Sequence, residues 1–389
     1  MSLDIEKIGD VCTVGDGAHA SIKRTLNGIP YYTSKNFKIE GIDLSKVDYI
    51  SEEDFKKHFR SNSNALTKPI KDDILLSIIG SIGAPHLVKD EDDFGLSSSV
   101  SILRPNVSKI EPQFLYYWIK SDNFQNAVHQ IKSGVAQSFL SLSMIKQLPV
   151  VYPKSLETQK RIASILSTYD DLIENNLKRI KLLEETAQNI YKEWFVNFRF
   201  PNYEHTAFDA ESGLPKGWEV DIIGNQLLTI KRNGKLKTDD YELEGKFPII
   251  DQANGFIAGY TNNEEVVQDL HLPIVVFGDH TRRVKFVNFP FVSGADGTQL
   301  MFPKNENLLP AYFYLSINNI DLSNYAYARH YKFMKEQPII IPDEKTLDEF
   351  NKKAYPMLEQ TIHLLNYNQK LKEARDILLP RLMNRTIEV

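Results

Sequence analysis

Apolar positions recur most regularly between residues 155 and 195, with a period of seven residues. A heptad repeat places apolar side chains on one stripe of an α-helix, which can pair with a second helix. Ser155 is a suitable N-cap, so we predict a long helix from about Ser155 to Phe195. Asn176 falls on the stripe, either as a solvated edge residue or as one that fixes the register. The apolar members of the stripe are Leu166, Tyr169, Ile173, Ile180, Leu183, Ala187, Ile190 and Trp194.

A second long helix is predicted from about Thr346 to Met383. Its stripe is marked by leucines seven residues apart, Leu364, Leu371 and Leu378, with Asn368 nearby. We expect Pro356 to kink or divide the start of this helix, because proline lacks the backbone N–H group. Neither helix can bury its stripe alone, so the two are expected to pair. The alternative is that both stripes are core faces of a helical domain.

Each long helix follows the same short motif, KQLPVVYP at 146–153 and KEQPIIIP at 335–342, 189 positions apart. Three further pairs of similar segments precede the two motifs in the same order. They are LDIEKIGDVCTV (3–14) with WEVDIIGNQLLTI (218–230), DDILLSIIG (72–80) with LPIVVFGDH (272–280), and EPQFLYYWIKS (111–121) with LPAYFYLSINN (309–319). A shared order over so many segments indicates an internal duplication.

The duplication predicts an α+β fold with two similar mixed α/β globular domains in a pseudo-two-fold arrangement, separated by a long antiparallel two-helix coiled coil. Short strands and frequent turns argue against a doubly wound sheet. We place the domains at 1–153 and 201–342, and the spacer helices at 154–200 and 343–389. Two diverged domains separated by such a coiled coil could each contact one half-site of a DNA duplex. This arrangement predicts an asymmetric bipartite site with a spacer whose sequence is not read.

The composition of the 389 residues, 42% hydrophobic and 25% charged, is typical of a folded soluble protein. No apolar run could cross a bilayer and no signal peptide is evident, so we expect a cytoplasmic protein without membrane contact. Cys12 is the sole cysteine and the nine histidines are scattered, which argues against disulfides and metal sites. A net charge of −5 is unusual for a nucleic-acid binder, so DNA contact must use local basic clusters or need other subunits.

Motifs for catalysis are missing from the sequence. GSIG (80–83) lacks the lysine and the helix of a phosphate-binding loop. NFPF (288–291) has Phe289 where the N/D-P-P-Y/F motif of an adenine methyltransferase needs proline, and DEKTLDEF (343–350) is a charged first helical turn. We therefore predict a protein without catalytic residues of its own.

Loops beside the repeated strands carry the candidate DNA-binding residues, because Arg, Asn and Gln read base edges and Lys and Arg contact phosphates. The alternative for each residue is an ordinary solvated loop. In the first half the candidates are Ser77, Ser81, Gln137 and Ser138, with Gly80 and Gly83 allowing close backbone approach. In the second half they are Lys231, Arg232, Lys235, His280, Thr281, Arg282, Arg283, Lys285, Arg329, His330, Tyr331 and Lys332.

Several segments resemble the specificity subunits of type I restriction–modification systems: QNIYKEWFVNFRFPNYEHTAF…GLPKGWEV (188–220), LLPRLMNR (378–385), FGDHTRRVKFVNFPFVSGADGT (277–298) and DDILLSIIGSIGAPHLV (72–88). The resemblance covers almost the whole chain. It implies two target recognition domains that alternate with two conserved helices, in a non-catalytic subunit that reads double-stranded DNA.

The resemblance also implies partners and cofactors. Two methyltransferase subunits would bind the helices and S-adenosylmethionine, and motor–nuclease subunits would bind ATP and Mg²⁺, so this chain would hold no cofactor itself. Two alternatives stay open: a coiled-coil scaffold without DNA readout, and the separate S chain of a related restriction enzyme that cuts outside its site.

Overall fold

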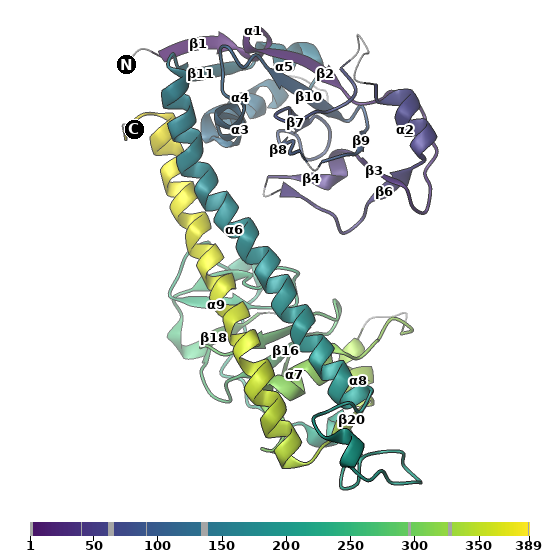
Figure 1. The fold of residues 1–389 in the computed structure, drawn as a ribbon. Helices are drawn as coiled ribbons and strands as arrows, with labels where there is room; N and C mark the ends of the chain where they lie inside the picture. Colours follow the sequence, from purple (N-terminus) through teal and green to yellow (C-terminus); the bar gives the residue numbers. More distant parts are fainter. Residues whose placement is uncertain are drawn as a thin grey trace. The chain divides into compact units, whose positions relative to one another are not determined.

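The computed structural model describes residues 3–39, 41–60, 66–90, 92–133, 139–294, 297–325, 329–387 and 389. The chain forms two compact units (Figure 1). The first unit takes in the chain up to Leu172 and from Leu371 onward, and the second holds Ile173–Lys370. Because both units include parts of the two long helices, the predicted division at 153, 200 and 342 stays a prediction.

The first unit is built on short strands, most of them in antiparallel pairs, and one central strand is fully buried. This strand, β7 (Ile74–Ser77), pairs with β8 (Pro85–Leu87) and with β10 (Val100–Pro105), which in turn pairs with β2 (Cys12–Asp16). Its ILLS sequence is apolar because both faces of the strand are covered. Further strands are β3 (Ile29–Tyr32), β6 (Asp48–Ile50) and β9 (Gly95–Leu96) in one sheet, and β4 (Phe37–Lys38) and β5 (Gly41–Ile42) in another.

Helices pack on these strands, and the most buried of them is the aromatic-rich helix α3 (Pro112–Lys120), which lies in the repeated segment 111–121. Its start is stabilised by the Glu111 carboxylate, which accepts a hydrogen bond from the N–H group of Phe114 at 2.7 Å. The rings of Phe114, Tyr117 and Trp118 lie in the core. The other helical segments of this unit are α1 (Ile8–Val11), η1 (Ser34–Asn36), α2 (Glu52–His58), α4 (Asp122–Ser133) and α5 (Leu142–Gln147).

The second unit has a matching buried strand, β16 (Ile274–Gly278), between β17 (Val284–Val287) and β19 (Thr298–Met301). A four-stranded sheet lies in the order β14 (Gly259–Thr261), β13 (Phe247–Ile250), β18 (Phe291–Ser293) and β15 (Val267–Gln268). The counterpart of the first aromatic helix is α7 (Pro310–Asn318), followed by α8 (His330–Lys335). Short helical turns are η2 (Lys192–Val196), η3 (Tyr203–His205), η4 (Ile223–Gln226), η5 (Thr238–Asp240) and η6 (Glu264–Val266).

The repeated proline motifs form equivalent strands in the two units. β11 (Pro149–Pro153) pairs antiparallel with β1 (Leu3–Lys7), and β20 (Pro338–Ile341) pairs antiparallel with β12 (Glu219–Ile222). Ile5 lies opposite Val151, and Val220 lies opposite Ile340, so the registers agree with the alignment of the two halves. The structure thus confirms two similar mixed domains, while their pseudo-two-fold relation stays a prediction.

The two long helices are α6 (Leu156–Tyr191) and α9 (Glu344–Met383), drawn in teal and yellow in Figure 1. The Ser155 hydroxyl accepts a hydrogen bond from the N–H group of Thr158 at 3.3 Å, as the sequence predicted. α9 continues through Pro356, so the prediction that this proline divides the helix was wrong. Pro356 is exposed, and Ala354 and Leu358 beside it are buried, so packing of the opposite face stabilises the helix across the proline.

The predicted stripes face the partner helix in both units. Ile173, Asn176, Ile180, Ala187 and Trp194 are buried, as are Leu166, Leu364 and Leu371, and the remaining stripe residues Tyr169, Leu183, Ile190 and Leu378 are half-buried. In the first unit Asp170 pairs with Arg375, whereas in the second Asn176 contacts Asn368 and Tyr191 contacts Phe350. In the second unit a later residue of α6 meets an earlier residue of α9, which confirms antiparallel packing.

Candidate nucleic-acid interface

The first unit presents its candidate loop between β7 and β8. Ser77 is fully buried and its hydroxyl donates to the carbonyl of Ile79 at 3.0 Å, so the expectation that Ser77 contacts DNA is contradicted. Ser81 is half-buried, and its hydroxyl donates to the carbonyl of Ser34 at 3.3 Å. The loop turns through Gly80 and Gly83 at φ of 71° and 91°, a backbone conformation that favours glycine. The other two candidates of this half, Gln137 and Ser138, lie outside the described residues.

The second unit presents an exposed cationic loop between β16 and β17, at residues His280–Arg283. Gln252 holds this loop twice: its side-chain oxygen accepts from the N–H group of His280 at 3.1 Å, and its carbonyl accepts from the hydroxyl of Thr281 at 2.6 Å. Arg282 has φ of 61°, and its N–H group donates to the carbonyl of Gly278. The loop conformation is therefore set by hydrogen bonds, while His280, Thr281, Arg282 and Arg283 remain accessible.

Both arginines of this loop have neutral partners. A guanidinium N–H group of Arg282 donates to the carbonyl of Leu322 at 3.1 Å, and Nε of Arg283 donates to the side-chain oxygen of Asn254 at 3.0 Å. Neutral acceptors orient a guanidinium without cancelling its charge, so the donors and charge of Arg283 stay available for an anionic ligand. Arg282 also interacts electrostatically with the carboxylate of Asp321, whose pKa it helps to lower.

The segment that begins α8 lies directly beside this loop. Arg329 and Lys332 are exposed and Tyr331 is half-buried, as DNA contact would require. His330 is buried, however, with its ring nitrogens 2.9 Å from the carbonyl of Asp279 and 3.2 Å from the carbonyl of Tyr325. The expectation that His330 contacts DNA is therefore contradicted, because both ring nitrogens are engaged inside the unit.

Asp279 joins the loop to α8. Its carbonyl accepts from the N–H group of His330 at 3.0 Å, and its carboxylate accepts from the N–H group of Tyr331 at 2.8 Å. Two candidate segments that are about 50 residues apart in the sequence therefore form one surface. We predicted neither Asp279 nor Gln252 from the sequence, although an aspartate directly after a buried strand is a recognisable signal.

The basic run at 231–235 is the third segment of this surface. Lys231 and Lys235 are exposed, and Arg232 is half-buried. Arg232 donates from its guanidinium to the side-chain oxygen of Gln299 at 3.2 Å. Because Gln299 lies opposite Phe277 in the β16–β19 pairing, Arg232 is close to the end of β16 from which the cationic loop starts.

Lys285 does not belong to the accessible surface. It is buried in β17, and its ammonium group donates to the carbonyl of Gly255 at 2.5 Å. Burial lowers the pKa of Lys285 to about 8, an effect that nearby Asp251 opposes. The expectation that Lys285 contacts DNA is therefore contradicted, because its hydrogen bonds hold a neighbouring loop instead.

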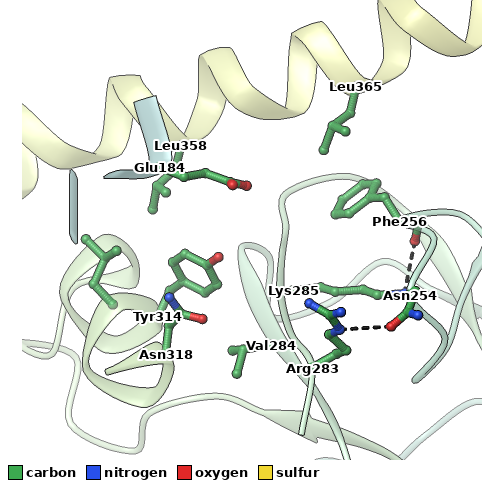
Figure 2. Close-up of a pocket in the computed structure, with 11 residues that line it drawn as sticks. Glu184, Asn254, Phe256, Arg283, Val284, Lys285, Tyr314, Asn318, Leu358 and Leu365 are labelled. Atoms are coloured by element: carbon green, nitrogen blue, oxygen red, sulfur yellow. Dashed lines mark hydrogen bonds between the residues drawn. The ribbon is translucent and has the colours of Figure 1, made fainter. Parts of the chain in front are cut away.

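Lys285 lines a cavity of about 370 Å³ within the second unit, between β17 and the helices (Figure 2). Glu184 of α6 and Tyr314 of α7 face the same space. Burial raises the pKa of the Glu184 carboxyl, so a cation or a hydrogen-bond donor beside it would be favoured. Arg283 supplies charge at the rim and is held by Asn254, as the dashed line in Figure 2 shows.

In the described ranges, His, Cys, Asp and Glu side chains form no group of three that could hold a metal ion. Among the helices described, none combines the length and the apolar composition that crossing a bilayer requires.

The sequence is similar to known proteins along most of its length. Residues 3–185 match the family described as "Type I restriction modification DNA specificity domain". The chain is 26% identical to the type I restriction enzyme MjaIX specificity subunit of Methanocaldococcus jannaschii, over 98% of this chain and 92% of that protein. It is 23% identical to the type I restriction enzyme HindI specificity subunit of Haemophilus influenzae, over 81% of this chain and 86% of that protein.

The fold has a counterpart among solved structures. The crystal structure of a type I restriction–modification system S subunit from M. genitalium superposes with a TM-score of 0.61. The alignment covers 98% of this chain and 96% of that one at 15% sequence identity, so it compares the fold alone. Residues 3–185 therefore match the DNA specificity domain of type I restriction–modification systems, and the chain is similar over 98% of its length to one of their specificity subunits.

Proposed function

We propose that the chain is the DNA-reading subunit of a type I restriction–modification complex and recognises an asymmetric bipartite site. Each recognition domain reads one half-site, and the paired helices set the gap between them. The observation that carries this proposal is the duplication: β1 with β11, and β12 with β20, form the same pairing in the same register beside a long helix. Two equivalent frames suit two half-sites of one duplex.

The loops on the two frames differ in chemistry, which supports an asymmetric site. After β7 the first unit presents Gly80 and Ser81, whose backbone and hydroxyl groups are uncharged. After β16 the second unit presents Arg282 and Arg283. Arginine forms paired hydrogen bonds with guanine in the major groove, so we expect guanine in the second half-site.

The same proposal assigns the chemistry to other chains. Two methyltransferase subunits would bind the helices and supply S-adenosylmethionine, and motor–nuclease subunits would supply ATP hydrolysis with Mg²⁺ and cleavage. This chain would contribute recognition without catalysis and hold no cofactor. A net charge of −5 fits such a division, because partner subunits would contribute much of the phosphate contact that dominates DNA affinity.

Methylome sequencing of a host that has no other type I system tests this function directly. The chain is co-expressed with its methyltransferase subunit, and the methylated motif is determined for the wild type and for Arg283→Ala. We expect an asymmetric bipartite motif, relaxed in Arg283→Ala at one half only. A scaffold without DNA readout predicts no dependence of the motif on this chain, and that result would overturn the proposal.

A further inference from the structure

A pocket of about 320 Å³ lies beside the cationic loop, within the second unit. We call it the Arg232 pocket and define it by Thr229, Arg232, Gln299, Tyr331 and Lys335, which all line it. These side chains supply two cations, an aromatic ring, an amide and a hydroxyl group. Such a set suits a ligand that is negatively charged and accepts hydrogen bonds.

The guanidinium of Arg232 is the central feature of this pocket. It is half-buried, and its hydrogen bond goes to the neutral side chain of Gln299 at 3.2 Å. No carboxylate of the described residues forms an ion pair with Arg232. Burial lowers the pKa of Arg232, an effect that the neighbouring Tyr331 opposes. A charge in such surroundings is stabilised when an anion enters, because buried charges are normally paired.

Lys335 and Tyr331 complete the pocket. The ammonium group of Lys335 is exposed and lies 5.1 Å from the centre of the Tyr331 ring. The backbone of Tyr331 is fixed by the carboxylate of Asp279, which accepts its N–H group at 2.8 Å. Because that carboxylate has a backbone partner and also anchors the cationic loop, the pocket and the loop are held in one arrangement.

We propose that the Arg232 pocket binds a phosphate group, and that in the DNA complex this group belongs to the backbone beside the second half-site. The inference rests on the proposed function and adds a named ligand chemistry to it. A guanidinium presents paired donors that match phosphate oxygens, and Lys335 adds a second charge. Phosphate contacts position a protein on the duplex, whereas base contacts read its sequence. The pocket thus anchors the duplex while the adjacent loop His280–Arg283 reads it.

Salt-dependent DNA binding tests this assignment. The full chain, purified with its methyltransferase subunit, is titrated with duplexes that contain the methylated motif or a scrambled motif, between 50 and 200 mM salt. The variants are Arg232→Gln, which keeps an amide for the contact with Gln299, and Lys335→Gln at an exposed site. Lys216→Gln, at an exposed lysine outside both long helices and outside the candidate interface, is the matched control.

Removing one phosphate contact should reduce the slope of log K against log salt concentration by about 0.9. We expect this reduction for Arg232→Gln and for Lys335→Gln on both duplexes, with an unchanged preference for the motif. The slope should be unchanged in Lys216→Gln. Equal slopes in all proteins would overturn the assignment. Selective loss of the preference would also overturn it, because the pocket would then read bases. Lys335→Gln keeps the test decisive if Arg232→Gln fails to fold.

Titration with inorganic phosphate, followed by ³¹P NMR, separates the possible sources of the ligand. If phosphate binds the wild type but not Arg232→Gln, and the DNA slopes are equal, the pocket binds phosphate and its assignment to the DNA backbone is refuted. If the wild-type complex binds no DNA, the proposed function fails. The phosphate titration then tests by itself whether the pocket binds phosphate. Binding to the wild type that is lost in Arg232→Gln supports a phosphate site, and absence of binding to the wild type refutes it.

Discussion

A buried amide pair in the helix seam should fix how α6 and α9 pack in the second unit. Asn176 and Asn368 are 3% and 5% exposed. The amide group of Asn176 donates to the side-chain oxygen of Asn368 at 2.8 Å, and the amide group of Asn368 lies 3.4 Å from the carbonyl of Ile173. A polar pair among apolar seam residues is satisfied only when the two asparagines meet, so a shifted register would leave both amides unpaired.

Replacing one asparagine by leucine, which has a similar size, should destabilise the pairing. The remaining amide is left buried without its partner, which costs about 1–3 kcal/mol. Replacing both should cost less than the sum of the single changes, because the leucine pair leaves no unsatisfied amide between the side chains. We expect a coupling free energy of about 0.5–3 kcal/mol between Asn176 and Asn368.

Hydrogen–deuterium exchange read by mass spectrometry measures this locally, in peptides that cover Asn176 and Asn368. Each single variant should raise the exchange rate of protected amides by about 5- to 150-fold, which is the equivalent of the cost of about 1–3 kcal/mol for one unpaired amide. Asn175→Leu, at the exposed neighbouring position, is the control and should change little. Strictly additive effects in the double variant would refute the idea that the amide pair acts as a unit.

Two further predictions concern the second recognition domain. Asp279→Ala should reduce the sequence specificity of methylation at one half-site, because it releases Tyr331. Asp279→Asn should retain the specificity, since its amide oxygen can still accept a hydrogen bond from the Tyr331 N–H group. Equal loss of specificity at both half-sites would count against this role. The pKa of Lys285 is about 8 when folded and 10.5 ordinarily, so the unfolded state holds more protons between these values and stability should rise with pH there. Urea titrations at several pH values should show this rise relative to Lys285→Met, and parallel curves would contradict it.

The helix seam could be predicted from the sequence because its information is local. A period of seven residues needs no knowledge of distant contacts, and Leu166, Ile180 and Leu371 are buried as expected. The prediction that Pro356 divides the helix was wrong because it used local propensity alone, while a kink at this proline stays a prediction. Burial of Ala354 and Leu358 on the opposite face outweighs the lost hydrogen bond at an exposed proline.

The candidate interface was predicted only in part, because accessibility depends on tertiary contacts. Lys285 and His330 have the residue types that contact DNA, yet carbonyl groups of distant segments surround the ammonium group of one and the ring of the other. The position of Lys285 along its strand did not predict its burial. Alternation assigns a side chain to one face of a sheet, but it does not show whether that face is covered. Conversely, Asp279 was not predicted because its role depends on a segment about 50 residues away.

The equivalent strands β7 and β16 show how such a chain can keep the structure of its domains while the DNA sequence that they recognise changes. Both strands are buried along their whole length, so their sequences are constrained by packing. Backbone hydrogen bonds close both loops, from Ser77 in one unit and from Gly278 in the other. The loop after β16 is held in addition by the side chain of Gln252. Exposed residues such as Arg283 can therefore be exchanged without disturbing the strands, and a change in one loop should alter one half-site without affecting the other.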